Sequence, residues 1–340
     1  MEATKKRLLL PDVLKGLAVI LMIHAHIMEQ IVNPGMFEGL PGKIAMNIGV
    51  FPGAAVFMLV MGYFTGYSSA GSGHIIKRGF VIFGGGILLN IALSISYIIR
   101  FIQTGYPELI PTAIFGVDIL LLAGLSLIII GGLKKHSSNP LLWMALALAV
   151  AAVTPWVNSL IDSLESAKYI TAFVGGTAKW SYFPLFPWLA YPLAGAGVYF
   201  AGFKWWPKLK PAVKWGIGFV LLAGSAIGYP MAFNTATDLA AHYHHGILYF
   251  LWSSIFVLLL VFILDRVRIE DYPLGTAFLS FTGHEVTLIY IIQWIIIGNL
   301  APWLGKNTLF VGHLVWTFAI VIVSVLLAYL YRKLRERKSG

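Results

Sequence analysis

Cysteine is absent from this chain of 340 residues, and charged residues are scarce, at 11% of the sequence. Without a thiol the chain forms no disulfide, offers no thiolate to a metal and has no cysteine nucleophile. Its 59% hydrophobic content lies far outside the composition of soluble domains. The basic residues, which give a formal net charge of +10, are scattered over short segments and form no basic patch for nucleic acid. We therefore expect an integral membrane protein without a nucleic-acid partner.

In place of a soluble domain, the chain has a row of apolar stretches whose length matches the hydrocarbon core of a bilayer, about 30 Å. Because backbone groups in lipid must be hydrogen-bonded internally, these stretches should be helices, and the alternating pattern of a membrane barrel is missing. The predicted spans are 14–31, 48–67, 79–100, 116–133, 140–156, 184–203, 213–233, 245–264, 276–297 and 309–331. The expected fold is an all-α polytopic membrane protein that forms one domain over residues 1–340.

The lysines and arginines lie mainly on alternate connections between these spans. One side holds Lys5, Lys6, Arg7, Lys15, Lys77, Arg78, Lys134, Lys135, Lys204, Lys208, Lys210, Lys214, Arg266, Arg268, Arg332, Lys333, Arg335, Arg337 and Lys338. The other side holds Lys43, Arg100, Lys168, Lys179 and Lys306. Short loops rich in Lys and Arg stay in the cytoplasm. The pattern predicts about ten crossings with both termini cytoplasmic. We expect the protein in the plasma membrane of a prokaryote, in contact with membrane lipid.

Asp12, Lys15, His26 and Glu29 share one broad side of the first span. At 100° per residue, Lys15 and His26 are only about 20° apart around the helix and roughly 16 Å apart along it. His24 points about 200° away from His26, so the two histidines cannot face one cavity. Ionisable groups inside a span usually face a cavity or a partner. We expect His26 to line a functional cavity, with a plain hydrogen bond to a neighbouring helix as the alternative.

The ninth span carries a second polar group, His284 and Glu285, and Gln293 follows on roughly the face of Glu285. An intramembrane glutamate is a functional candidate by default, and a structural polar contact is the alternative. Asp118 lies near the start of the fourth span. We consider Asp118, Glu285 and Glu29 as carboxylates that would orient His26.

Two outer connections, 157–183 and 234–244, are the longest polar segments. Near the first, Tyr182 and Trp188 offer faces on which a sugar could stack, and residues of a membrane-interface belt are the alternative. The histidines at 242, 244 and 245 lack a recognisable metal-ligand spacing, so we predict no metal. They either contact an acceptor or belong to a polar loop.

Several segments also resemble a known family. Leu10 to His26 is similar to the opening motif of multi-pass membrane acyltransferases, in which Asp, two residues, Arg-Gly and an apolar stretch lead to a His eleven residues after the Arg. Val56 to Tyr63 resembles the Phe-rich second helix, and Lys77-Arg78 the basic turn. Residues 182–195 resemble a segment of the branch related to heparan-alpha-glucosaminide N-acetyltransferase. Phe281 to Gln293 resembles a late Gly-Arg-x-Ser-Leu-x-x-Tyr-x-x-His pattern.

This chain departs from those motifs at a few positions. Lys15 and His284 stand where the family has Arg, Gln293 stands where it has His, and Met61 stands where it has Ser. Lysine keeps the charge of arginine but loses its bidentate fork. These departures leave open a changed acyl donor or acceptor, or a catalytically silent member.

The resemblance implies a cytoplasmic acyl-CoA, most simply acetyl-CoA, a tunnel through the membrane, and a glycan or other polar acceptor on the far side. The predicted catalytic residues are His26 as general base, with Glu285 and Asp118. The polyanionic donor needs cations, and the predicted donor-binding residues are Lys15, Asp12, Lys77, Arg78, His284 and Arg266. The predicted acceptor-binding residues are Glu29, Trp188, Tyr182 and Gln293.

The polar side of the first span, formed by Asp12, Lys15, His26 and Glu29, also fits two other functions. One is a small-solute transporter or channel, and the other is a helical membrane subunit without catalysis. The pairs Gly62-x-x-x-Gly66 and Gly224-x-x-x-Gly228 permit close helix contacts. Packing within the chain is the favoured interpretation of both pairs, and a homodimer is the alternative.

Overall fold

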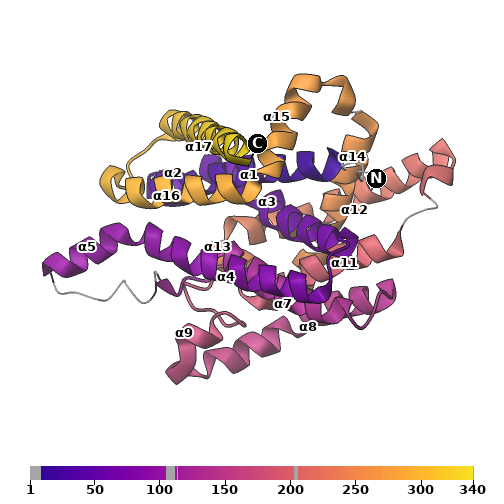
Figure 1. Cartoon of the computed structure of the whole chain (residues 1–340), viewed down its shortest axis with the longest axis horizontal. Coiled ribbons are helices and arrows are strands. Elements are labelled where there is room, and N and C mark those ends of the chain that lie inside the picture. Colours follow the sequence, from indigo (N-terminus) through magenta and orange to yellow (C-terminus); the bar gives the residue numbers. More distant parts are fainter. Residues whose placement is uncertain (1–8, 105–111, 113, 203–205, 268, 340) are drawn as a thin grey trace. The chain divides into compact units, whose positions relative to one another are not determined.

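The computed structural model describes residues 9–104, 112, 114–202, 206–267 and 269–339 (Figure 1). Lys5, Lys6, Arg7, Lys204 and Arg268, which enter the charge pattern, lie outside the described residues. The chain divides into two compact units, one of residues 1–56 and 257–340 and the other of residues 57–256. The domain boundaries of 1–340 stay a prediction.

Helices make up most of both units. The first unit holds α1 (Leu9–Ile31), α2 (Pro34–Glu38), α15 (Pro273–His284), α16 (Val286–Leu304) and α17 (Phe310–Ser339). The second holds α4 (Ser72–Leu93), α5 (Ile95–Thr104), α7 (Ile119–Lys134), α8 (Pro140–Asp162), α9 (Lys168–Thr171), α10 (Leu185–Trp188), α11 (Ala190–Ala201), α12 (Pro211–Thr237) and α13 (Leu239–Tyr243). Two further helices, α3 (Leu40–Tyr67) and α14 (Ile247–Val267), contribute residues to both units.

Within the described residues, eight helices are long and apolar enough to cross a membrane: α1, α3, α4, α8, α12, α14, α16 and α17. Two more apolar segments, Ile119–Lys134 and Leu185–Ala201, are shorter. A helix of 16 residues such as α7 is about 24 Å long, less than the ~30 Å core. The helical membrane fold is thus confirmed, whereas the count of ten and the sides of the termini stay predictions.

The ninth predicted span, 276–297, is not one continuous helix. Glu285 has φ −93° and ψ 19°, which ends α15, and α16 begins at the next residue. Gly283 packs directly on the backbone oxygen of Asp12 in α1, and the bend follows immediately after this contact. Glu285 therefore lies at the break between two helices, which corrects the prediction of one continuous helix over 276–297.

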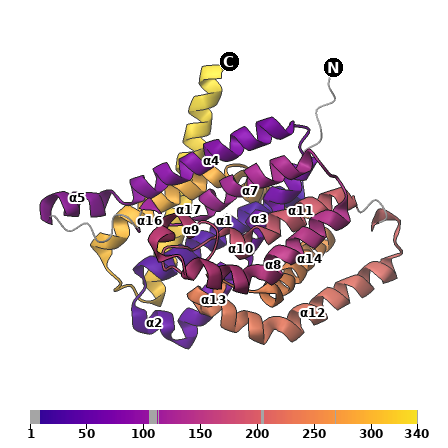
Figure 2. The same ribbon diagram turned by 90° about the horizontal axis from the view of Figure 1, so that it is seen from below.

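In the first unit, α1 packs against α15, α16 and α17, and α16 and α17 lie side by side (Figures 1 and 2). The α1–α15 contact is close because glycines are present on both helices: a Cβ atom at Gly16 would overlap the backbone of Leu279. Beyond the end of α1, the backbone N–H of Asn33 donates to Thr308 (3.0 Å), which ties α1 to the segment that precedes α17. These contacts fix the orientation of α1 within its unit.

In the second unit, α4 and α7 form an extensive pair, and α8 packs on α11 (Figure 2). Gly62 faces the backbone of Pro192, and Gly66 faces the ring of Tyr199. Gly228 lies against Trp252 in the same way. These glycines therefore serve packing within the chain, as the sequence favoured. A homodimer remains a separate, untested prediction.

Candidate active site

The imidazole of His26 in α1 meets the side chain of Gln293 in α16, although 267 residues separate them. The His26 Nδ1 lies 3.2 Å from the Gln293 Oε1. The Gln293 Nε2 donates to the backbone oxygen of Tyr290 (3.2 Å), so the amide oxygen is the atom directed at His26. An oxygen acceptor there assigns the proton to Nδ1 of the imidazole. The Nε2 of His26 consequently carries a lone pair that can accept a proton.

Two aromatic rings pack against the imidazole of His26. The ring of Trp294 lies 4.1 Å from that of His26, centroid to centroid, at an interplanar angle of 33°. The ring of Tyr290 meets His26 edge-on at 6.1 Å. Gln293 is fully buried, whereas His26 is half-buried. The site thus holds a fixed imidazole that is not sealed off on all sides.

His24 belongs to a different cluster, as the helical spacing predicts. Its Nε2 lies 2.9 Å from the backbone oxygen of Ala45 in α3, to which it donates. Its ring meets that of His313 in α17 at 4.5 Å. His313 is fully buried, and neither of its ring nitrogens makes a hydrogen bond. The two histidines of α1 therefore have separate surroundings.

Charged groups collect at the beginning of α1 and around the bend at Glu285. The Lys15 Nζ pairs with the Asp12 carboxylate at 2.9 Å, and Asp12 is only 2% exposed. The Glu285 Oε1 lies 3.5 Å from the His284 Nε2 and 3.8 Å from an Arg332 guanidinium nitrogen. The contact of Gly283 with the Asp12 backbone joins these two sets. Three basic side chains, Lys15, His284 and Arg332, thus gather at one end of the first unit.

The comparisons with known proteins bear on these same residues. The family whose description is "Heparan-alpha-glucosaminide N-acetyltransferase, catalytic" matches residues 7–222, which is more than half of the chain. The chain belongs to this family. Searches of the curated proteins and of the solved structures found no match. The matched segment includes His26 and Lys15, whereas Gln293 and Glu285 lie beyond it.

The sequence offers Asp118, Glu285 and Glu29 as carboxylates that would orient His26, and the structure places an amide next to the imidazole. The hydrogen-bond partner of His26 is the amide of Gln293. Glu285 pairs with His284 and Arg332, and Asp118 caps α7 by accepting from the backbone N–H of Ile119. Both carboxylates therefore have partners of their own at the helix bend and the helix start, and their catalytic roles stay predictions.

Other predicted residues are placed as follows. Lys77 and Arg78 are exposed on α4 of the second unit, so their contact with the donor stays a prediction. Arg266 pairs with the adjacent Asp265 at the end of α14. Glu29 is half-buried near the end of α1.

The two aromatic residues proposed to bind the acceptor differ in their accessibility. Trp188 is buried, at 1% exposure, and its indole donates to the backbone oxygen of Tyr243 (2.8 Å). Tyr182 is 43% exposed and packs edge-on against Tyr243. Of the two, only Tyr182 offers an open ring face, so a contact between Trp188 and an acceptor would require the packing to change.

The histidines near residue 242 form part of a buried hydrogen-bond network. The Tyr191 hydroxyl lies 2.9 Å from the His245 Nε2, and the His245 Nδ1 lies 2.7 Å from the backbone oxygen of His242. Burial lowers the pKa of His242 well below its usual value and lowers the pKa of His245 to about 3. Both rings are therefore neutral at pH 7, and their contacts are those of packed structural residues.

Three residues escaped the sequence reasoning: Trp294, His313 and Arg332 as a partner of Glu285. His313 carried a usable signal, because a histidine within a predicted span is an ionisable group in the membrane. In the sequence, Arg332 is only one of the basic residues that report the membrane topology, and Trp294 is one of many apolar residues of a predicted span. Their roles depend on contacts between distant helices, which spacing along the sequence does not reveal.

Proposed function

We propose that this chain is a membrane acetyltransferase that moves the acetyl group of cytoplasmic acetyl-CoA to an amino sugar on the opposite side of the membrane. The observation that carries the proposal is the hydrogen bond between His26 and Gln293, which leaves the His26 Nε2 as a proton acceptor. Membership of the N-acetyltransferase family supports the reaction class. The proposed topology has ten crossings with both termini cytoplasmic.

In the proposed reaction, the acceptor nitrogen attacks the thioester carbonyl. A nitrogen–carbon bond forms, the carbon–sulfur bond breaks, and CoA leaves as the thiol. His26 Nε2 takes the proton from the attacking nitrogen and returns it to the departing sulfur, so the enzyme ends unchanged. The reaction needs a positioned acceptor and a base, and no metal is required for it.

The surroundings of His26 suit this proton transfer. When Nε2 gains a proton, Nδ1–H continues to donate to the Gln293 oxygen, so the ring need not turn. The transient imidazolium then lies 4.1 Å from the face of Trp294, where a ring quadrupole attracts a cation. Gln293 thus acts as a positioning residue, and Trp294 favours the charged intermediate state of the base.

The proposed donor site is the group of cations around Lys15, His284 and Arg332. Asp12 pairs with Lys15, and Glu285 lies close to His284 and Arg332, which orders these side chains for the phosphates of CoA. Lys77, Arg78 and Arg266 are proposed as additional donor contacts. Glu29 and Tyr182 are proposed to contact the acceptor.

The test is acetyl transfer to a glucosaminide by the purified protein in lipid nanodiscs. His26→Ala should lower kcat by about 10²–10⁴-fold, the usual contribution of a general base. Gln293→Leu should lower kcat by roughly tenfold, because the proton is no longer assigned to Nδ1, with the KM for acetyl-CoA unchanged.

Asn299→Leu is the matched control, since Asn299 lies on the same helix and its amide donates to the backbone oxygen of Ile295, four residues earlier. This variant should keep near-normal turnover. Full activity of a folded His26→Ala protein would remove His26 from the mechanism.

A further inference from the structure

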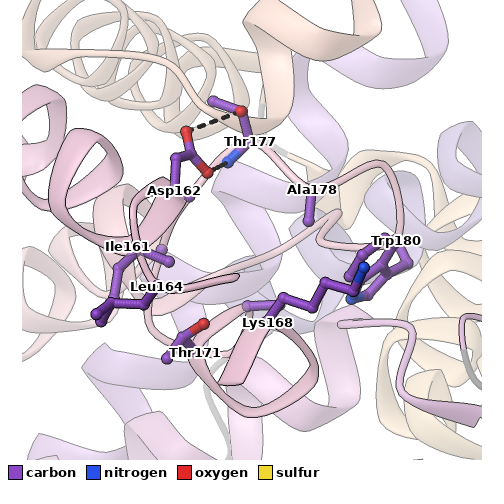
Figure 3. Close-up of a pocket in the computed structure, with 11 residues that line it drawn as sticks. Ile161, Asp162, Leu164, Lys168, Thr171, Thr177, Ala178 and Trp180 are labelled. Atoms are coloured by element: carbon purple, nitrogen blue, oxygen red, sulfur yellow. Dashed lines mark hydrogen bonds between the residues drawn. The ribbon is translucent and has the colours of Figure 1, made fainter. Parts of the chain in front are cut away.

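A pocket of about 290 Å³ opens in the second unit, between the end of α8 and the segment that follows α9 (Figure 3). Its polar lining includes Asp162, Lys168, Thr171 and Thr177, and Trp180 forms one wall. This volume is at the lower end of the range for small-molecule sites, which begins near ~300 Å³. The pocket therefore suits a ligand the size of one ring with its substituents.

Hydrogen bonds fix the polar side of the pocket. The Asp162 carboxylate accepts from the Thr177 backbone N–H (2.8 Å) and from the Thr177 hydroxyl (2.9 Å). Gly176, at φ +89°, adopts a left-handed conformation that side chains rarely take, and its N–H donates to Asn158 (2.9 Å). A Cβ atom at Gly176 would come within 2.8 Å of the Asp162 carboxylate. The chain thus holds this carboxylate in place before any ligand arrives.

The aromatic wall is equally fixed. The Trp180 ring stacks on Tyr169 with centroids 5.2 Å apart, and the Trp180 backbone oxygen accepts from Val117 (2.7 Å). The indole N–H of Trp180 is buried and makes no hydrogen bond. The ring of Trp180, and not its buried N–H group, is therefore the part of this side chain that lines the pocket. In Figure 3 the Lys168 side chain points toward Trp180.

We propose that this pocket binds the sugar ring of the acetyl acceptor. A pyranose has apolar C–H faces that suit an indole, and hydroxyl groups that both donate and accept. The pocket supplies a carboxylate acceptor at Asp162, an ammonium donor at Lys168 and the ring of Trp180.

The proposal rests on the acetyltransferase function proposed above and deepens it by naming the acceptor site. It agrees with the predicted topology, because residues 157–183 form a connection on the side opposite the acyl-CoA entrance. The exposed Lys168 belongs to the five cations that the charge pattern assigns to that side.

The experiment uses the whole protein in nanodiscs with methyl α-glucosaminide as the probe, and measures both the sugar-induced shift in Tm and steady-state kinetics. Asp162→Asn and Trp180→Ala should each raise the KM for the sugar by about tenfold, as expected for losing a charged hydrogen bond or a ring contact. The KM for acetyl-CoA and kcat should stay within about twofold of the parent. Both variants should lose the shift in Tm.

Two substitutions outside the pocket are matched controls. Trp156→Ala removes a 71% exposed indole from α8, and Asp238→Asn alters a carboxylate that likewise accepts from a backbone N–H. Neither should change the KM for the sugar.

The two proposals can fail separately. If acetyl transfer occurs but Asp162→Asn and Trp180→Ala leave the sugar KM unchanged, or match their controls, the pocket assignment is overturned and the function stands. If the parent protein transfers no acetyl group, yet the sugar raises its Tm and Asp162→Asn abolishes that shift, the pocket stands and the function fails. If the parent protein shows neither acetyl transfer nor a sugar-induced shift in Tm, both proposals are overturned.

Discussion

At the scale of single residues, the contact of Gln293 with His26 explains how a glutamine can serve at this position of the motif. The motif that residues 281–293 resemble has a histidine at this position, and the glutamine lies within hydrogen-bond distance of His26. A neutral amide assigns the imidazole proton without adding charge to the apolar site. A carboxylate in its place would bring an ionised group into the membrane, which is costly.

The histidines at 242 and 245 make stability depend on pH. Burial lowers the pKa of His242, and lowers that of His245 to about 3, from an unfolded value of 6.5. The stabilisation is therefore complete above pH ~6.5 and is lost as the pH falls toward 3, because the unfolded chain binds the protons first. We expect the free energy of unfolding to fall by about 1 kcal/mol per pH unit for each ring.

Denaturant unfolding between pH 7 and pH 4 measures this slope. His245→Gln should flatten it, whereas His136→Gln, which changes an exposed histidine, should not. An unchanged slope in a folded His245→Gln protein would show that His245 titrates normally and is not buried as described.

At the scale of elements, the contact between α1 and α15 carries the geometry of the candidate donor site. It joins residues near Asp12 to residues near Glu285, and it depends on glycine at 16 and 283. Small residues allow two helix backbones to come into van der Waals contact. Within lipid this packing stabilises helix association, because the hydrophobic effect does not drive helices together there. The sequence offers these glycines but does not say which ones meet.

Substitution of Gly283 tests this contact. Gly283→Ala should destabilise the protein by about 1–3 kcal/mol, because the added Cβ collides with the Asp12 backbone and overpacks the site. Gly275→Ala on the same helix meets nothing within 4 Å, so it should be neutral or slightly stabilising. Thermal unfolding in nanodiscs compares the two. Equal Tm values would mean that α1 and α15 do not touch at Gly283.

At the scale of the whole molecule, the number of crossings decides which side of the membrane each connection faces. Eight helices are long enough to span, and the segments Ile119–Lys134 and Leu185–Ala201 are shorter. If neither short segment crosses, the connections at 135–139 and 163–184 exchange sides, while the later ones keep theirs. The side of the proposed sugar pocket therefore depends on α7 and on the α10–α11 segment.

The absence of cysteine allows a clean test, because single cysteines can be introduced into an otherwise unreactive chain. With ten crossings, Ser163→Cys should react with a membrane-impermeant maleimide on intact cells, and His136→Cys should react only after permeabilisation. Both positions are exposed, so accessibility to the reagent does not differ between them. The reverse labelling pattern would establish eight crossings and place the pocket in the cytoplasm.

The sequence by itself determined the class of protein, the helices and the residues on which to look for chemistry. Apolar length, charge bias and helical angle are local quantities, so they revealed the membrane fold, the stripe of Asp12, Lys15 and His26, and the separation of His24 from His26. The family motifs likewise directed attention to Gln293 before any contact was known.

Only the tertiary structure decided which side chains meet. It placed the amide of Gln293 beside His26, broke the ninth predicted span at Glu285, and buried Trp188 and His245. It also built a pocket around Trp180 from the end of one helix and a loop. Such contacts depend on how helices pack and bend across large sequence separations, and no local periodicity records that information.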